Sequence, residues 1–450
     1  MKRSSLVPLS LLLFLLLAAP ATFADDRAVQ ATPQGAVRLT LDDAIARART
    51  SSARLTSLSA LTRAAAEGVR GANSGKRPEL DLSASYARNS NVPELVLSFP
   101  GSAPRTIFPN LPNQWRTHVG ATLPLYTGGR VESQVSAATE TEHATTSDRA
   151  AAENDLVAET HIAYVSVLFA RENARVLGEA VASYEGHLKD ARNRQDLGLA
   201  ASNETLAITV ERERAELGRV QAENAAAMST ANLLRLLGLP SNTFVELDDA
   251  PLISAPTPGQ SDELVRRATA GRAELEALRA RIRAMDATIR VSQSTSRPQV
   301  GLQAGYDLAN PNPRILPLTG DWKDTWSVGV SVNWRVLDGG RSNASSAQSQ
   351  AQADALRAQL SDLESRIRLD VLTRRLELDS ALAGKAVAQR GIEAARDAVR
   401  VSRDRYKEGV LSSSELLDAE TRLLRSELDA TQNDAQIQVA LAALTRAVGR

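Results

Sequence analysis

Cysteine is absent from this chain of 450 residues, which excludes disulfide bonds, thiolate catalysis and metal sites built on cysteine. Aromatic side chains make up only 4% of the sequence, a low share for a compact globular enzyme. Acidic and basic residues balance at 53 each, so no overall field favours nucleic acid or an anionic membrane surface. Beyond the N-terminus, no apolar run approaches the roughly 18 residues that a transmembrane helix needs. The abundant Ala, Leu, Arg, Glu and Ser instead favour long helices.

No metal, cofactor or catalytic site emerges from the sequence. The four histidines are scattered and no pair is spaced i, i+4; they are His118, His143, His161 and His187. No Ser-His-Asp arrangement is indicated, and acidic pairs such as Asp42-Asp43 are better explained as charges at a helix start. We therefore expect a protein that is not an enzyme and that binds no cofactor.

The N-terminus has the three parts of a secretory signal peptide. Lys2 and Arg3 form the basic start, and an apolar core runs from Leu6 to Ala19. Small residues follow, so the sequence predicts that residues 1–24 are a signal peptide cut near Ala24. An uncleaved anchor is the alternative.

The chain contains a long internal duplication. Gly128-Gly129-Arg130 returns as Gly339-Gly340-Arg341, a step of 211 residues from 128 to 339. The same step relates further pairs: Trp115 with Trp326, Gly198 with Gly409, Glu204 with Glu415 and Gly238 with Gly449. Upstream the step is 220, as from Tyr86 to Tyr306, so the first copy has nine extra residues between its Tyr and its Trp. A repeat of this kind sets the architecture.

The duplication divides the mature chain into a first repeat at 25–240 and a second repeat at 261–450, joined by a Pro-rich linker at 241–260. Each repeat predicts the same order of a helix, two strands, a Gly-Gly step and a helix hairpin. The first helix is expected from Leu39, with Thr40 as its cap, to about Gly71.

Four segments alternate apolar residues with small or polar ones, which is typical of strands with one apolar face. These segments are residues 79–87, 115–126, 298–307 and 325–336. The pattern is that of an outer-membrane barrel, with lipid outside and water inside, and the long Pro-rich loops between paired strands are then extracellular. A soluble, half-buried sheet is the alternative.

Helix hairpins are predicted at 130–238 and 341–449, where no proline interrupts the first arm of either hairpin. About 66 residues in that arm correspond to roughly 100 Å of helix. Apolar pairs seven residues apart, Leu416-Leu417 and Leu423-Leu424, indicate coiled-coil-like packing of the returning arm.

Four strands cannot close a barrel, and an open sheet edge in lipid leaves backbone groups unsatisfied. Three chains would give 12 strands, a number within the range of known barrels. We therefore predict a membrane α/β barrel assembly, a homotrimer whose strands share one β-barrel and whose helices form an α-barrel on the same axis. Four glycines, able to adopt unusual dihedrals, mark the strand–helix junctions: Gly128, Gly129, Gly339 and Gly340.

The chain resembles the TolC-like outer-membrane efflux protein family over essentially all of its mature length. The resemblance rests on the duplicated strand pairs, the first helix, the Leu-Tyr-Thr-Gly-Gly-Arg junction at 125–130, and hairpin tips at 197–204 and 406–415. It implies an outer-membrane channel-tunnel that extends into the periplasm and gives a passive exit duct for efflux or type I secretion. It further implies a periplasmic adaptor (membrane fusion) protein, an inner-membrane RND or ABC-type exporter, outer-membrane lipid as surroundings, and no nucleic acid.

The resemblance also assigns site residues. Adaptor contact falls on both tips, at Gly198, Leu199, Ser202, Gly409, Val410 and Ser412. The gate falls on the acidic residues Glu415 and Asp418, on a locking Tyr406 and on its acidic partner Glu204. One departure is Leu411, which stands where the well-studied member has a locking Arg. Either the gate latch is weaker in this chain, or Lys407 or Arg405 takes that role.

Glu415 and Asp418 lie i, i+3 apart and share a helix face. If this face points into the bore of a trimer, the two residues of three copies form rings of carboxylates. Their crowding raises the pKa values of the carboxylates, and their charge attracts cations. The alternative is an ordinary solvated face. For the whole chain, the alternative function is a non-transporting periplasmic coiled-coil adaptor or scaffold, motivated by the long helices.

Overall fold

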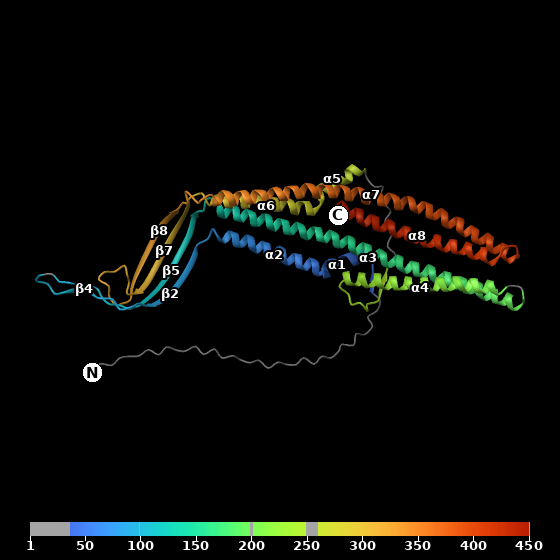
Figure 1. The fold of residues 1–450 in the computed structure, drawn as a ribbon, viewed down its shortest axis with the longest axis horizontal. Coiled ribbons are helices and arrows are strands. Elements are labelled where there is room, and N and C mark those ends of the chain that lie inside the picture. Colours follow the sequence, from blue (N-terminus) through green and yellow to red (C-terminus); the bar gives the residue numbers. More distant parts are fainter. Residues whose placement is uncertain (1–36, 99, 199–200, 249–259, 450) are drawn as a thin grey trace, which may run out of the picture.

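The computed structural model describes residues 37–98, 100–198, 201–248 and 260–449. The predicted signal peptide and Leu199 lie outside these residues. The described chain is elongated, with a sheet at one end and long helices that run from it to two turns at the other end (Figure 1). This arrangement separates the strand pairs from the predicted tips by the full length of the helices.

The sheet has four antiparallel strands in the order β2-β5-β7-β8. Their bounds are β2 Glu79–Arg88, β5 Asn113–Tyr126, β7 Gln299–Asn310 and β8 Lys323–Asn333. Each repeat supplies two adjacent strands, and β5 pairs with β7 where the repeats meet. The last strand ends at Asn333, short of the predicted residue 336, and the Trp334 Nε1 beyond it donates to the Ser296 carbonyl oxygen at 3.0 Å. β2 and β8 have one free edge each within the described sheet.

The two faces of the sheet differ in chemistry, as the alternating pattern predicted. Leu80 and Leu82 on β2 are each 73% exposed, and Val330 on β8 is 63% exposed. On the opposite face, Arg116 Nη2 lies 2.7 Å from Asp307 Oδ1, and His118 Nδ1 lies 2.9 Å from the same oxygen. One face is therefore apolar and uncovered in the single chain, while the other carries paired charges.

Two small sheets were not predicted from the sequence. The loop expected to be irregular between the first two strands contains a hairpin of β3 (Leu95–Leu97) and β4 (Arg105–Phe108), where the first copy is longer. The predicted linker contains β6 (Val245–Leu247), which pairs in parallel with β1 (Val37–Leu39). The parallel pair ties the linker to the start of the first repeat.

The predicted first helix is in fact two helices, α1 (Leu41–Ser51) and α2 (Ala53–Ser74). Ser52 is extended, at φ −67° and ψ 113°, and its side chain accepts a hydrogen bond from the Leu55 amide, which caps α2. The second repeat breaks in the same way between α5 (Ser261–Gly271) and α6 (Ala273–Ser294). Neither break contains proline, so the sequence pattern alone did not show it.

The long helices match the predicted hairpins closely. They are α3 (Arg130–Asp196), α4 (Ser202–Leu236), α7 (Arg341–Lys407) and α8 (Ser413–Ala447). Both first arms have 67 residues and both returning arms have 35, as the ungapped repeat requires. Among the described residues, no helix combines the length and apolar character needed to cross a membrane.

Apolar clusters and ion pairs hold the helices together at mid-height, where the two repeats also meet. Arg446 Nε on α8 lies 2.8 Å from Asp155 Oδ1 on α3, and Arg54 Nη2 on α2 lies 3.3 Å from the other oxygen of Asp155. Arg272, whose side chain is almost fully buried, bonds Asp370 on α7 at 3.1 Å. Ion pairs at this level thus connect helices from both repeats.

The paired glycines lie where strand passes into helix. Gly128 and Gly129 have φ of 67° and 86°, and Gly339 and Gly340 have φ of 67° and 87°. These left-handed values are costly for residues with a side chain. A Cβ on Gly128 would also lie 2.8 Å from the Cβ of Arg297, whereas a Cβ on Gly339 would meet nothing within 4 Å. The first junction therefore needs glycine for two reasons and the second for one.

This difference gives a matched pair of substitutions. Gly339→Ala should lower the free energy of unfolding by about 1–2 kcal/mol, the cost of a left-handed alanine. Gly128→Ala should cost about 1–3 kcal/mol more, because Arg297 must move. Urea unfolding of the two variants beside the parent measures both costs. An equal loss in the two variants would show that the close approach to Arg297 carries no energy.

Candidate functional site

Apart from Leu199, the predicted tip residues lie at the end of the molecule farthest from the sheet, in the α3–α4 and α7–α8 turns (Figure 1). Gly198 and Gly409 each follow a long helix with φ of 73°, the conformation of a glycine that ends a helix. Val410 is 74% exposed beside Gly409. The α7–α8 turn thus presents an exposed apolar side chain next to its glycine.

Tyr406 and Glu204, predicted as partners, are in contact. The Tyr406 hydroxyl on α7 donates to Glu204 Oε1 in the first turn of α4 at 2.5 Å. Burial and this hydrogen bond raise the pKa of Tyr406 to about 12, so the phenol stays protonated as a donor. The bond joins the two hairpins near their tips.

The cation beside Tyr406 comes from a residue that the sequence did not suggest. The guanidinium carbon of Arg194 on α3 lies 4.9 Å from the centre of the Tyr406 ring, within cation–π range. Arg405 and Lys407 are exposed and make no side-chain hydrogen bond within the described chain. Of the three, Arg194 is the cation placed against the tyrosine.

Glu415 has a structural role in addition to its predicted one. Its amide donates to Ser412 Oγ at 3.3 Å, and its carboxylate accepts from the Ser412 amide at 3.1 Å, which forms a capping box at the start of α8. These bonds, from the Ser412 side chain first and then its backbone, lower the pKa of Glu415. The predicted rise of the carboxylate pKa concerned Glu415 crowded by the acidic residues of three copies, so it stays a prediction. Asp418, one turn further along α8, takes no part in the cap.

A second contact between the hairpins was missed by sequence reasoning. His187 on α3 has its Nε2 2.7 Å from Glu420 Oε1 on α8, and Arg403 Nη2 on α7 donates to the same oxygen at 3.2 Å. Glu420 is only 8% exposed. His187 and Glu420 are 233 residues apart in the chain, so no local pattern could have paired them.

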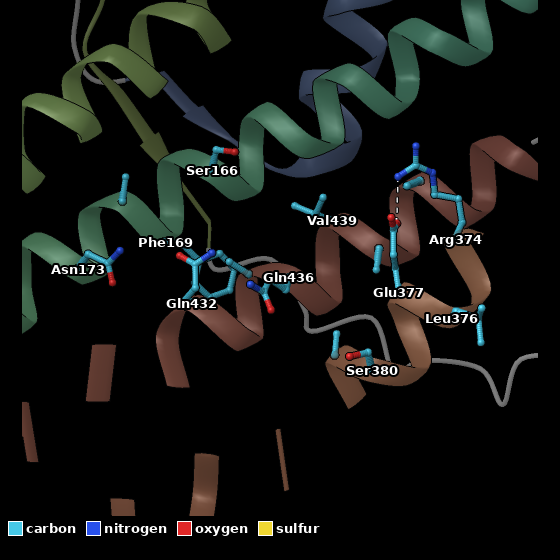
Figure 2. Close-up of a pocket in the computed structure, with 15 residues that line it drawn as sticks. Ser166, Phe169, Asn173, Arg374, Leu376, Glu377, Ser380, Gln432, Gln436 and Val439 are labelled. Atoms are coloured by element: carbon cyan, nitrogen blue, oxygen red, sulfur yellow. Dashed lines mark hydrogen bonds and ion pairs between the residues drawn. The ribbon is translucent and has the colours of Figure 1, made fainter. Parts of the chain in front are cut away.

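A groove of about 730 Å³ lies at mid-height between α3, α7 and α8 (Figure 2). Phe169 and Val439 line it beside amide side chains, and Arg374 Nη1 donates to Glu377 Oε2 at 2.9 Å on its wall. Within the described ranges, no group of three or more His, Asp or Glu side chains is placed to hold a metal ion. The groove offers apolar and amide contacts, which suit passage or packing.

Comparison with known proteins identifies relatives across both repeats. The family model described as outer membrane efflux protein matches residues 44–239 and 264–450. The chain is 26% identical over 352 residues to the outer membrane protein OprJ of Pseudomonas aeruginosa, covering 74% of this chain and 69% of OprJ. It is 24% identical over 423 residues to the outer membrane efflux protein BepC of Brucella suis biovar 1, covering 93% of this chain and 87% of BepC.

A solved structure agrees with the fold described above. The outer-membrane channel OprN superposes with a TM-score of 0.76 at 20% identity, over 91% of this chain and 89% of OprN. The predicted channel-tunnel fold is thereby confirmed, and so is the predicted place in the outer membrane with extension into the periplasm. Because the family model matches most of both repeats, the chain belongs to the outer membrane efflux protein family.

Proposed function

We propose that this protein is a passive exit duct that works as a homotrimer, docks on a periplasmic adaptor protein, and receives cargo from an inner-membrane RND or ABC-type exporter. An efflux role in the outer membrane follows from the family. The finer assignment rests on the geometry of the sheet and of the tips. Energy comes from the exporter, since the chain supplies only a path.

The observation that carries the proposal is the unfinished sheet. β2 and β8 each have a free edge, and the apolar face of the sheet is uncovered. β2 leads away from the helices and β8 leads back to them, so β8 of one copy can pair antiparallel with β2 of the next. Three four-stranded sheets joined in this way give 12 strands and leave no open edge in lipid. A soluble scaffold protein would expose this apolar face to water, which is unfavourable.

Assembly and conductance test this proposal directly. Protein purified in detergent should have the mass of three chains and should conduct ions in a planar bilayer. A preference for cations is expected, because Glu415 and Asp418 of three copies would lie around one passage. Light scattering gives the mass, and the reversal potential in a salt gradient gives the selectivity. A monomer without conductance would contradict the proposal and favour a periplasmic scaffold.

The gate is proposed at the contact between Tyr406 and Glu204, with Asp418 near the narrowest point. Tyr406→Phe removes the hydroxyl that donates to Glu204 but keeps the ring under Arg194. A hydrogen bond to a charged group contributes about 1.5–3 kcal/mol, so the ratio of closed to open channels should fall at least tenfold. Bilayer conductance should rise accordingly.

Tyr126→Phe, at the end of β5, is the matched control, because it changes the same side-chain chemistry far from the tips. Its conductance should equal that of the parent. If Tyr406→Phe and Tyr126→Phe behave alike in properly assembled protein, the gate does not depend on this hydroxyl.

The adaptor contact is proposed at the tips. Acidic side chains at both turns, Gly198→Asp with Gly409→Asp, should abolish capture of the adaptor and export while assembly is retained. Aspartate tolerates left-handed dihedrals better than most residues, which limits damage to the turns. Gly186→Asp with Gly391→Asp is the control. These glycines lie in α3 and α7, the helices that lead to the two tips, and an added Cβ at either would meet nothing within 4 Å. Normal export by the tip variant would place docking elsewhere.

A further inference from the structure

The groove between α3, α7 and α8 opens on one face of the helical layer. On α3, Tyr164 and Val167 pack into the apolar cluster that includes α1, β1 and β6, whereas Phe169, two positions after Val167, lines the groove (Figure 2). Residues two positions apart in a helix are about 200° apart around its axis. The groove therefore lies on the side of α3 that faces away from α1 and from the small parallel sheet.

The other two helices show the same division. On α8, Ile437 and Leu441 belong to the apolar cluster that includes α5, and Val439 between them lines the groove. On α7, Leu378 belongs to that cluster and Leu376 lines the groove. α1, α5 and the small sheet thus add bulk to one face of the layer, and a narrow cylinder has room for such bulk on its outer face. In the proposed trimer, the groove would then face the passage.

Small side chains on α8 make the groove hollow. Its floor there carries Ala435, Val439 and Ala443. The positions 211 residues earlier, on α4, carry larger residues, which are Asn224, Met228 and Asn232. Because the same backbone holds larger side chains in α4, the helix itself does not require the small ones on α8.

The lining combines apolar surface with neutral hydrogen-bonding groups. Phe169, Leu376 and Val439 provide the apolar contacts, and Leu376 is 67% exposed. Gln432 and Gln436 present exposed amide side chains that make no hydrogen bond within the described residues. Each amide has a carbonyl acceptor and an NH₂ donor. The groove can therefore bond a polar group of either kind.

The charges in the lining compensate each other. Arg374 and Glu377 are the charged members among the described residues that line the groove, and Arg374 Nη1 donates to Glu377 Oε2 at 2.9 Å. Arg374 Nε also donates to Asp370 Oδ1 at 3.3 Å. A charged molecule that entered the groove would lose water without gaining a free counter-charge, which costs free energy. A neutral molecule avoids this cost.

We propose that the groove binds uncharged aromatic molecules of small-drug size that carry hydrogen-bonding groups. The aromatic ring packs between Phe169 and Leu376, and the amides of Gln432 and Gln436 bond the polar groups. The volume of about 730 Å³ lies within the range of small-molecule sites, which are mostly apolar with a few polar groups. That these molecules are cargo in transit rests on the proposed duct, whereas the binding itself does not.

The absence of native cysteine permits a direct test with a single reporter thiol. Gln436→Cys places the thiol in the groove, and Ala225→Cys places it at the equivalent, exposed position of α4. The probe is N-phenyl-1-naphthylamine, an uncharged aromatic amine with one N–H donor. At about ten times its Kd, it should slow maleimide alkylation of Gln436→Cys about tenfold, because one-site binding leaves about a tenth of the grooves open.

Mass spectrometry of the assembled protein in detergent gives both alkylation rates. The rate of Ala225→Cys should not change with the probe. Slowing of both variants alike, or of neither, would overturn the proposal.

A charged analogue tests the preference for neutral molecules. 8-Anilinonaphthalene-1-sulfonate has the same ring system as the neutral probe and adds one negative charge. Because the lining offers no free cation, half-maximal protection of Gln436→Cys should need at least about tenfold more of the sulfonate. Equal protection by the two probes would overturn the assigned class of ligand.

Two leucines of α7 form a matched pair for the apolar contact. Leu376 in the groove is 67% exposed, and Leu369, which is not part of the lining, is 66% exposed. In the Gln436→Cys background, Leu376→Asn should raise the concentration of N-phenyl-1-naphthylamine for half-maximal protection about three- to tenfold, the effect of losing one or two buried methylene groups. Leu369→Asn should leave it unchanged. Equal shifts in the two variants would contradict binding in the groove.

The remaining outcomes separate the groove from the duct. If another copy covers the groove in the assembled protein, Gln436→Cys reacts much more slowly than Ala225→Cys without any probe, and the proposal is wrong. A protein that conducts ions but shows no protection by the probe refutes the groove site alone. Protection in a protein that forms no channel supports the binding site and refutes its role in carrying cargo.

Discussion

The structure depends on one constraint, the need of backbone groups at the sheet edges for hydrogen-bond partners. Four strands leave β2 and β8 with free edges next to an uncovered apolar face. The helices inherit the order of the strands: α2, α3, α6 and α7 lie side by side in the same sequence as β2, β5, β7 and β8. Completion of the sheet by other copies would therefore complete the helical layer as well.

The helices that pack against α3 change at mid-height. Near the sheet, α3 packs between α2 and α6, whereas towards the tips it packs between α4 and α8. The change coincides with the breaks at Ser52 and Arg272 and with the ion pairs around Asp155 and Arg446. At this level Arg446, near the end of α8, forms ion pairs with Asp155 on α3 and with Asp370 on α7. The apolar clusters on either side then hold two hairpins that are joined by few polar bonds near the tips.

The two repeats are alike in backbone and different in the side chains that join the hairpins. Helix lengths and glycine dihedrals agree between the copies. The second copy carries polar groups that the first lacks at the equivalent positions. Ser412, Tyr406 and Glu420 align with Ala201, Gln195 and Thr209 of the first copy. Duplication thus supplies two similar hairpins, and divergence adds polar side chains near the tip of the second.

The sequence by itself determined the duplication, the four strands, the lengths of the hairpins and the glycine junctions, because each depends on local periodicity or on backbone dihedrals. The partnership of Tyr406 with Glu204 was expected through the family resemblance. Only the tertiary structure decided the break at Ser52, where no proline or glycine marks the end of a helix, and the small parallel sheet of β1 and β6. It also decided the bond between His187 and Glu420, since residues so far apart in the chain meet only when two hairpins pack, and neither residue stands out from its neighbours before that.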